Sequence, residues 1–545
     1  MQVAEVVGRT LARLGADHVF GVVGSGNFHV TNALVAGGAR FVAARHEGGA
    51  ATMADAYARV SGRVGVLSVH QGCGLTNATT GITEAAKSRT PLVVLAAEVA
   101  GSAVRSNFRI DQAGLAAAVG AVPDRVHSAQ SAVDDTVRAY RRALVERRTV
   151  VLNLPLDVQA APVPGELRTP ELKVPALPRP SAAAAEELAA LLSGARRPVF
   201  LAGRGARKAR AELLELADRT GALLATSAVA HGLFHGSPWS LGISGGFASP
   251  LAAELIGGAD LVVGWGCALN MWTLRHGRLI AADAAVAQVD LDPDALGAHH
   301  PISLGVLGDV AEAAAAVTAL LPATPAPGYR SPALRDRIGS EGRWRDVPYF
   351  DESDPDLIDP RTLSIALDDA LPAERVVAVD SGNFMGYPSA YLSVPDEAGF
   401  CFTQAFQSIG LGLATAVGAA LARPDRIPVA ALGDGGALMA AAELDTVVRL
   451  GLPMVIVVYD DSAYGAEVHH FGPDGHPLDT VVFPDTDIAA IGRGFGCEGV
   501  TVRRREDLAG LSAWLDGPRD RPILLDAKVT GRHGAWWLEE AFRGH

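Results

Sequence analysis

Short apolar runs alternate with helical stretches along almost the whole chain, and this alternation constrains the fold more than any other feature. Runs such as VGVLSV, DLVVGWG and PMVIVVYDD are apolar nearly throughout, rather than at every second position. Strands of that kind are buried on both faces, as in parallel sheets that carry helices on each side. The sequence therefore predicts an α/β fold built from doubly wound parallel sheets.

Two proline-rich stretches divide the chain. Residues 160–185 and 321–336 are poor material for helices and strands, and we interpret them as linkers. They leave blocks at 1–160, 186–321 and 345–545, which suits a chain of 545 residues at roughly 150 residues per domain. We expect three doubly wound domains with a Rossmann-like one in the middle. Ligands of such sheets bind at the carboxyl ends of the strands.

The charge balance and the N-terminus exclude several classes of function. The formal net charge is −13 and there is no run of Lys or Arg, which argues against nucleic acid or an anionic membrane as a partner. The N-terminus does not resemble a secretory signal, and no apolar stretch reaches the roughly 20 residues that span a bilayer. The four cysteines lie far apart, so neither a disulfide framework nor a zinc site is expected. These features predict a cytoplasmic protein.

Three carboxylates stand at the ends of two successive predicted strands. The strand IPVAAL leads into the turn GDGG at 433–436, with a helix expected from about Ala437, and the strand PMVIVVY leads into Asp460 and Asp461. A glycine turn at a helix start suits a phosphate, but Asp434 would repel it unless a cation lay between them. Asp434 and Asp461 therefore predict a diphosphate bridged by Mg²⁺, with Asp460 structural. The alternative is that Asp434 only caps its helix.

The sequence GDG, followed by a helix, a strand and an acidic turn, resembles the cofactor signature of thiamine diphosphate (ThDP) enzymes, usually GDG…NN. The resemblance implies that Mg²⁺ is bound by Asp434, Asp461 and the backbone carbonyl of Ala463. The cofactor-binding residues that it implies in this stretch are Gly433, Asp434, Gly435, Gly436, Asp461, Ala463 and Tyr464. Both asparagines are aspartates here, and the added negative charge predicts a tighter Mg²⁺ dependence or a shifted pH optimum.

Residues 43–98 resemble the pyrimidine domain of the acetolactate synthase and pyruvate oxidase branch of that family. The stretch begins RHEGGAATMADAYARVSG and continues into GCGLTNATTGITEAAKSRTP. Glu47 matches the glutamate that hydrogen-bonds the aminopyrimidine ring of the cofactor and drives its tautomerisation. Such a carboxyl needs apolar surroundings that favour its protonated form. The alternative is an ordinary helix-start glutamate that interacts with the helix dipole.

Two further segments match the family around the cofactor. In QAFQSIGLGLATAVGAALA, at 404–422, Ile409 matches the bulky residue that holds the cofactor in its bent shape, although alone it would be an ordinary core residue. The segment VDSGNF at 379–384 falls where relatives contact the diphosphate. The resemblance thereby adds Gly382, Asn383, Gln407, Ser408 and Ile409 to the cofactor-binding set.

The middle block holds FAD in some relatives. The stretch FLAGRGARKA supplies Gly203 and Gly205, but Lys208 stands where the third glycine of a dinucleotide fingerprint would fall. We therefore expect no FAD.

Three polar residues bear on the reaction. Ser25 and His70 resemble the serine and histidine of benzoylformate decarboxylases, and Glu467 matches a catalytic glutamate of pyruvate decarboxylases. A structural histidine and a solvated glutamate are the alternatives. Overall, the chain is similar to the acetolactate synthase branch rather than to these decarboxylases. It differs from that branch at RHEGGA, which replaces RHEQGA, and at NFRIDQAG, which replaces the AFQE substrate loop.

The resemblance implies a ThDP- and Mg²⁺-dependent enzyme that acts on a 2-oxo acid through an enamine intermediate. Acetolactate synthase-like ligation is the leading prediction. A benzoylformate or pyruvate decarboxylase-type reaction and a 2-hydroxyacyl lyase are the alternatives, followed by a non-catalytic ThDP-fold subunit. Glu47 would face the diphosphate site of a partner chain, so a homodimer or homotetramer with active sites at the subunit interface is expected.

Overall fold

The computed structural model of the chain describes residues 1–163 and 168–538, and its first sheet lies within residues 18–155. The strands are β1 (His18–Gly21), β2 (Arg40–Ala43), β3 (Gly65–Val69), β4 (Leu92–Glu98), β5 (Val122–Arg125) and β6 (Thr149–Pro155). All are parallel, in the order β2-β1-β3-β4-β6-β5. The helices are α1 (Val3–Arg13), α2 (Phe28–Ala36), α3 (Glu47–Ser61), α4 (Cys73–Asn77), α5 (Thr79–Lys87), α6 (Gln112–Ala118), α7 (Ala132–Glu146) and α8 (Leu156–Ala160). We call this part the first domain.

The second domain contains another six-stranded parallel sheet. Its strands are β7 (Pro198–Ala202), β8 (Leu223–Thr226), β9 (Ser240–Ile243), β10 (Leu261–Trp265), β11 (Ala285–Asp290) and β12 (Leu304–Leu307). They pair in the order β12-β11-β10-β7-β8-β9. The helices are α9 (Ala182–Gly194), α10 (Arg210–Thr220), α11 (Pro250–Gly257), α12 (Met271–Leu274), α13 (Val310–Leu320) and α14 (Pro332–Glu341).

The third domain repeats the arrangement. Its strands are β13 (Arg375–Val379), β14 (Phe400–Phe402), β15 (Ile427–Gly433), β16 (Val455–Asp460), β17 (Glu498–Val502) and β18 (Ile523–Lys528), in the order β14-β13-β15-β16-β18-β17. The helices are α15 (Pro360–Ala370), α16 (Gly386–Tyr391), α17 (Gly412–Ala422), α18 (Asp434–Met439), α19 (Glu443–Arg449), α20 (Gly465–Phe471), α21 (Ile488–Phe495) and α22 (Ala509–Asp516). The prediction of three doubly wound parallel sheets is confirmed.

The sequence does not predict β5, β9, β12, β14 and β17, and each of these strands lies at an edge of its sheet. Buried and more exposed residues alternate along β5, β9 and β12, and β14 has only three residues. An edge strand has a neighbour on one side only, so it need not be a continuous apolar run. The apolar signal therefore reveals the centre of each sheet better than its margins.

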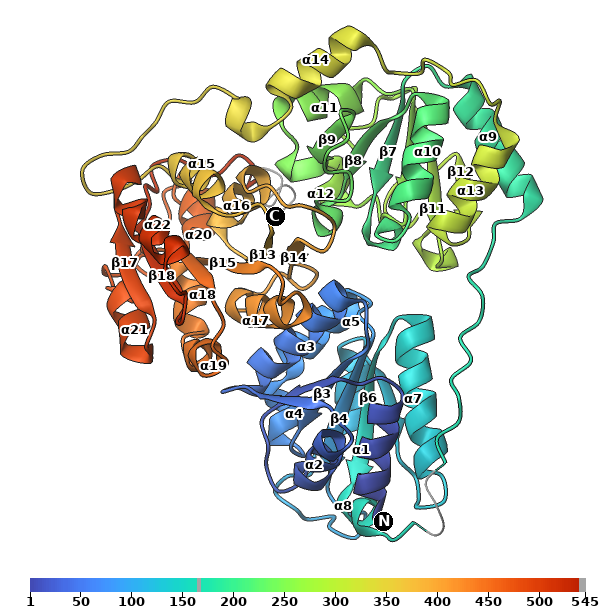
Figure 1. The fold of residues 1–545 in the computed structure, drawn as a ribbon, viewed down its shortest axis with the longest axis vertical. Coiled ribbons are helices and arrows are strands. Elements are labelled where there is room, and N and C mark those ends of the chain that lie inside the picture. Colours follow the sequence, from blue (N-terminus) through green and yellow to red (C-terminus); the bar gives the residue numbers. More distant parts are fainter. Residues whose placement is uncertain (164–167, 539–545) are drawn as a thin grey trace.

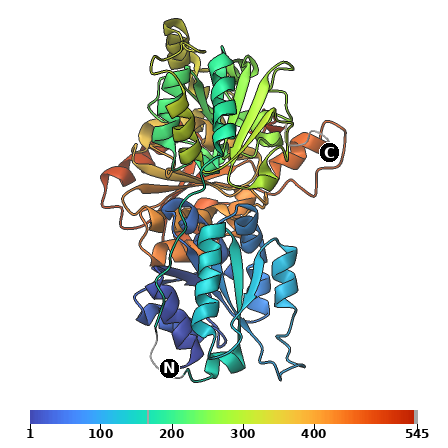
Figure 2. The same cartoon turned by 90° about the vertical axis from the view of Figure 1, so that its right-hand side faces the viewer.

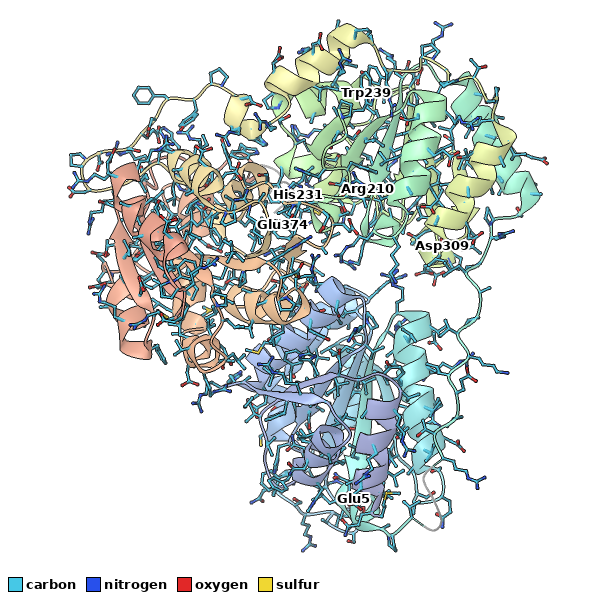
Figure 3. The ribbon with its side chains drawn as sticks, viewed as in Figure 1. Glu5, Arg210, His231, Trp239, Asp309 and Glu374 are labelled. Carbon is cyan, nitrogen blue, oxygen red and sulfur yellow. The ribbon has the colours of Figure 1, made fainter. Side chains whose placement is uncertain are left out.

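The third domain contacts both of the others, which lie at opposite ends of the molecule (Figures 1 and 2). Helix α3 packs along α17, so that Met53 and Ala54 share one hydrophobic core with Leu413 and Val417. Towards the second domain, the half-buried His231 (labelled in Figure 3) meets the ring of Phe400 edge-on at 5.2 Å. The third domain is thereby packed against both of its neighbours.

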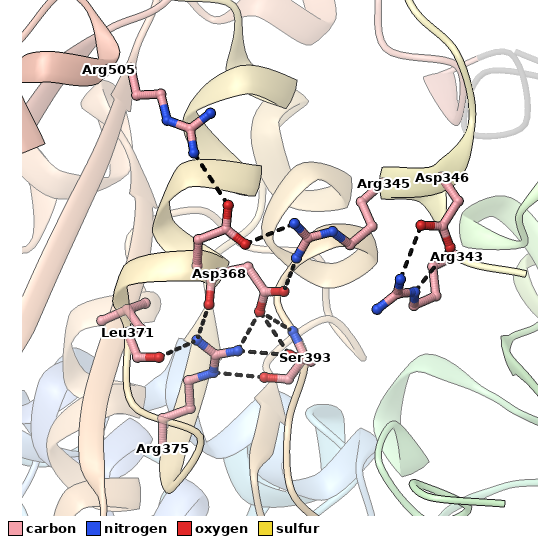
Figure 4. A network of polar contacts seen from close by, with 9 residues as sticks. Arg343, Arg345, Asp346, Asp368, Leu371, Arg375, Ser393 and Arg505 are labelled. Atoms are coloured by element: carbon pink, nitrogen blue, oxygen red, sulfur yellow. Dashed lines mark hydrogen bonds and ion pairs between the residues drawn. The ribbon is translucent and has the colours of Figure 1, made fainter. Parts of the chain in front are cut away.

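The segment that connects α14 to α15 is fastened to the third domain. Arg345 pairs with Asp368 at 3.0 Å and with Asp369 at 2.7 Å, and Trp344 stacks on Trp536 at 4.0 Å between ring centroids (Figure 4 shows the ion pairs). Within the described part of the chain, no helix has both the length and the apolar character that crossing a membrane requires.

Candidate active site

A cleft of about 2020 Å³ is lined by residues of all three domains and reaches the carboxyl ends of β13, β15 and β16. Most of the residues that the sequence places around a cofactor line it. They are Gly382, Asn383, Gln407, Ile409, Gly433, Asp434, Gly435, Gly436, Asp461, Ala463 and Tyr464, and the predicted catalytic residue Glu467 lines it as well. Ser408 is absent from the cleft lining found among the described residues, and its hydroxyl donates to the carbonyl of Ile409 at 3.2 Å.

Asp434 and Asp461 form an acidic pair in this cleft. Asp434 is 8% exposed, and burial together with the charge of Asp461 raises its pKa to about 7. Burial also raises the pKa of Asp461 to about 6, although Asn383 Nδ2 donates to its carboxylate at 3.5 Å. Two carboxylates so placed repel each other when ionised, and a divalent cation between them would remove that repulsion. The donor set of oxygens suits Mg²⁺.

The turn around Asp434 differs slightly from the expectation. Helix α18 begins at Asp434, not at about Ala437, because Gly433 is extended (φ −86°, ψ 163°) and the chain turns directly into the helix. Opposite this turn, Gly382 has φ +139°, a conformation that side chains other than hydrogen rarely allow. The neighbouring Asn383 Oδ1 is buried without a hydrogen-bond partner among the described residues. An acceptor left open beside two acids fits a site that a cation and its ligand would complete.

Asp460 points away from the cleft into a buried ion-pair cluster, as its predicted structural role requires. Lys528 Nζ lies 2.5 Å from Asp460, 2.6 Å from Asp485 and 3.2 Å from Asp526. Burial opposes the charge on Lys528, but Asp460 and Asp485 outweigh it and raise the pKa of the ammonium group. Lys528 thus neutralises one of the two aspartates of the turn and leaves the other facing the cleft.

Lys528→Met is expected to lower the free energy of unfolding by about 3–5 kcal/mol, because it leaves buried carboxylates without their cation. Adding Asp460→Asn should recover part of that loss. Urea unfolding of the two variants measures both effects, with Lys208→Met at an exposed position as the matched control. A loss as small as that of the control would contradict the role of Lys528.

Asp380 is a site residue that the sequence analysis missed. It is fully buried after β13, and its carboxylate accepts from the backbone N–H groups of Ser381 (2.8 Å), Gly410 (2.9 Å) and Leu411 (3.2 Å). Burial raises its pKa to about 6, against the effect of these donors. It therefore fixes the chain just after Ile409. Its position at a strand end, like that of Asp434, is the signal that would have revealed it.

A second group of predicted residues gathers at the carboxyl ends of β1 and β3 in the first domain. Ser25 Oγ lies 3.4 Å from His70 Nε2, and His70 Nδ1 lies 3.1 Å from the carbonyl oxygen of Gln71. Since a carbonyl only accepts, the neutral ring carries its hydrogen on Nδ1 and accepts from Ser25 through Nε2. Phe108 meets the His70 ring edge-on at 5.2 Å. The structure thus places Ser25 and His70 side by side, and their roles in a reaction stay predictions.

Glu47 is the first residue of α3, and its position is fixed from two sides. Asn77 Nδ2 donates to its carboxylate at 3.0 Å. The buried carboxylate of Glu443, from the third domain, accepts from the backbone N–H groups of Arg45 (3.1 Å) and His46 (3.0 Å). Glu443 was not predicted, because its contact lies almost 400 residues away in sequence.

The two groups do not share one cleft within a single chain. Glu47, Ser25 and His70 are absent from the lining of the cleft that holds Asp434 and Asp461, as far as the described residues show. One chain therefore carries two separate groups of predicted site residues.

The glycine loop of the second domain is packed against its own sheet. Gly203 N–H donates to the carbonyl of Trp265 at 2.9 Å, and a Cβ at Gly203 would lie 2.2 Å from the carbonyl oxygen of Gly266. The close approach of these two loops alone requires glycine at 203. The absence of FAD stays a prediction.

Comparisons with known proteins agree with this geometry. Residues 1–118, 185–317 and 380–527 match the N-terminal TPP binding domain, the central domain and the C-terminal TPP binding domain of thiamine pyrophosphate enzymes. Thiamine pyrophosphate is another name for ThDP.

Several curated relatives span nearly the whole chain. A sulfoacetaldehyde acetyltransferase of Rhodobacter capsulatus is 28% identical over 99% of this chain and 96% of its own length. The protein named "Probable 2-ketoarginine decarboxylase AruI" of Pseudomonas aeruginosa is 31% identical, over 92% of this chain and 89% of its own. The large subunit of acetolactate synthase isozyme 2 of Escherichia coli is 26% identical over 99% and 97%. With all three parts matched in order, the chain belongs to the family of thiamine diphosphate-dependent enzymes.

Proposed function

We propose that the protein is a Mg²⁺- and ThDP-dependent enzyme that acts on a 2-oxo acid, as an acetolactate synthase-like carboligase or decarboxylase. The observation that carries the proposal is the acidic pair of Asp434 and Asp461 beside the open acceptor of Asn383, at the carboxyl ends of parallel strands. In this proposal Asp434, Asp461 and the carbonyl of Ala463 hold Mg²⁺. Gly382, Gly433 and Gly435 leave room for the diphosphate.

Bound ThDP supplies a carbon nucleophile that adds to a carbonyl group and stabilises the resulting negative charge. The chain supplies the proton handling and the shape of the site. Glu47 would hydrogen-bond the aminopyrimidine ring of the group through its carboxyl, and Ile409 would support the group in a bent shape. His70, oriented by the carbonyl of Gln71, takes or gives a proton at Nε2 with Ser25 as its partner.

Simple decarboxylation is the second candidate, and the Ser25–His70 pair and Glu467 favour it. The pair is preformed at 3.4 Å, and Glu467 lines the cleft from α20. Decarboxylation ends with the protonation of a carbon, and both the Ser25–His70 pair and Glu467 are groups that can carry that proton. Ligation instead requires that such protonation be avoided. The names of the relatives cover acetyl transfer, decarboxylation and acetolactate synthesis, so the fate of the substrate needs a direct test.

That test is product analysis by mass spectrometry with Mg²⁺ and ThDP present. Pyruvate, benzoylformate, 2-ketoarginine, sulfoacetaldehyde and a 2-hydroxyacyl-CoA form the panel of substrates. A ligated product from pyruvate supports the carboligase, and an aldehyde with CO₂ supports the decarboxylase. Bound Mg²⁺–ThDP without turnover of any substrate would instead support a non-catalytic subunit.

In this proposal the first-domain group around Glu47 and the third-domain group around Asp434 are the two half-sites of an active site. A second copy of the chain joins them, with Glu47 of one chain facing Asp434 of its partner. Exposed apolar side chains surround both half-sites, which supports this arrangement. Phe28 and Phe108 are 52% and 45% exposed beside Ser25 and His70, and Met439 and Phe483 are 57% and 41% exposed around the acidic pair. A monomer would leave these side chains in water. We therefore propose a homodimer, or a homotetramer made of two such dimers.

Asp461→Asn is expected to raise the Mg²⁺ concentration for half-saturation by about tenfold or more, because the site loses a negatively charged ligand. Calorimetric titration with Mg²⁺ at a fixed ThDP concentration measures this midpoint without any turnover of substrate. Asp460→Asn is the matched control, since its carboxylate pairs with Lys528 and should shift the midpoint much less. Equal midpoints for the wild type and Asp461→Asn would contradict the idea.

A further inference from the structure

All three domains meet around the side chain of Arg59, in the last turn of α3. The guanidinium is 8% exposed and pairs with Asp55 at 2.6 Å and with Glu84 at 2.7 Å. It also donates to the carbonyl of Phe402, at the end of β14 in the third domain, at 3.0 Å. From the second domain, Arg207 donates to the carbonyl of Arg59 at 2.7 Å. One buried cation thus ties a helix of the first domain to an edge strand of the third.

Glu84, on α5, extends this junction to the cleft. Its side chain is fully buried, and its two oxygens accept from the backbone N–H groups of Ala405 (3.1 Å) and Phe406 (2.7 Å). Burial opposes the charge, but Arg59 and these two donors hold the pKa of Glu84 below its ordinary value. The carboxylate therefore stays ionised at neutral pH and binds the backbone of the third domain through these two hydrogen bonds.

The segment bound in this way is the loop at 403–411, which carries Gln407 and Ile409 into the cleft. Gln407 has φ +61°, a conformation that a residue other than glycine holds only when its surroundings impose it. Glu84 fastens the entry to the loop, and Asp380 fastens its exit through Gly410 and Leu411. The middle of the loop makes neither of these contacts, and it faces the cleft in a conformation that its two fixed ends determine.

We infer that Glu84 is a positioning residue, which sets the loop at 403–411 against the cofactor through a contact between the first and third domains. The inference rests on the proposed function, because it assigns the loop to ThDP. Arg59 is the counter-charge that keeps Glu84 ionised. Both backbone donors belong to the two residues that lead directly into Gln407, so this contact sets where the loop enters the cleft.

Glu84→Gln, in the full-length protein, tests the inference. The amide keeps the shape of the side chain but presents an NH₂ group to N–H donors, so the loop loses one of its two fastenings. We expect Mg²⁺–ThDP to bind within about threefold of the wild type in calorimetry. We expect kcat to fall about 10- to 100-fold and the near-UV circular dichroism of the bound cofactor to change, because small displacements at a reacting centre are costly.

Asp55→Asn is the matched control. Asp55 is an equally buried partner of Arg59, and it accepts a second hydrogen bond from the hydroxyl of Thr90 at 2.6 Å rather than from the loop. It should lose stability while keeping kcat within about threefold of the wild type and leaving the dichroism of the cofactor unchanged. Equal losses of kcat in both variants, or no loss in Glu84→Gln, would overturn the inference.

Hydrogen exchange of the wild type keeps the inference testable if Glu84→Gln does not fold. The amides of Ala405 and Phe406 should be protected already in the protein without cofactor, and adding Mg²⁺–ThDP should change their exchange less than twofold. Large protection gained only with the cofactor would mean that the cofactor orders the loop, which overturns the inference. If the wild type binds no Mg²⁺–ThDP at all, the proposed function fails, while the exchange of these amides still reports on Glu84.

Discussion

Glu47→Gln is expected to lower kcat by about 10²- to 10⁴-fold while the protein still binds Mg²⁺–ThDP. Glutamine keeps the size of the side chain and can accept the bond from Asn77, but it has no proton to give. The residues proposed to hold the diphosphate belong to the third domain and are untouched. Steady-state turnover, with cofactor binding measured by calorimetry, separates the two effects. Retained turnover would remove Glu47 from the chemistry and leave it a helix-start residue.

Asp434→Ala is expected to act on binding rather than on turnover of bound cofactor. Removing a residue that only hydrogen-bonds to a metal ligand lowers the metal affinity of a site by about 10–100-fold. Removing a ligand itself should therefore weaken Mg²⁺–ThDP binding by at least about 100-fold. The protein without cofactor should lose no stability. Burial raises the pKa of Asp434 to about 7, so its ionised form costs folding free energy above that pH.

Calorimetry with Mg²⁺ and ThDP and thermal unfolding of the apoprotein at pH 8 measure the two results. Asp460→Asn, which alters the neighbouring acid on the far side of the turn, is the control for binding. A variant that binds the cofactor normally would contradict the assignment of Asp434 as a metal ligand.

Mixing the two inactive variants tests whether the sites cross the subunit interface. A mixed dimer of Glu47→Gln and Asp434→Ala chains has one site with both defects and one site with neither. Activity should therefore reappear after the chains are dissociated and reassembled together. If each site were built within one chain, every site in the mixture would carry a defect and no activity would return.

The sequence predicts the centres of the three sheets and the residues at the carboxyl ends of their central strands. The runs that form β15 and β16 are apolar throughout, and the acids that follow them break the pattern at one edge of the sheet. Periodicity and a strand-end rule are then enough to bring Asp434 and Asp461 together. The edge strand β2 is predicted from its apolar run, whereas the other five edge strands are missed because they are short or carry less of the apolar signal, as the alternation in β5 and β12 shows.

What the sequence could not predict are the buried groups that support the site from elsewhere in the chain. Glu84 contacts residues more than 300 positions away, and Glu443 contacts a segment nearly 400 positions away. Neither lies in a motif of its own, and a lone glutamate on a helix is usually a solvated residue. Their roles depend on how domains pack, which no local pattern encodes.

The packing of Gly203 against Gly266 bears on how glycine fingerprints are used to assign cofactors. Any chain that folds its second domain in this way must keep glycine at that position, whether or not a nucleotide ever binds there. Selection for the fold alone would therefore preserve one glycine of a dinucleotide motif in proteins that bind no nucleotide there. In domains of this architecture, a glycine in this loop indicates that two loops lie close together. Which cofactor binds has to be inferred from the side chains around the loops.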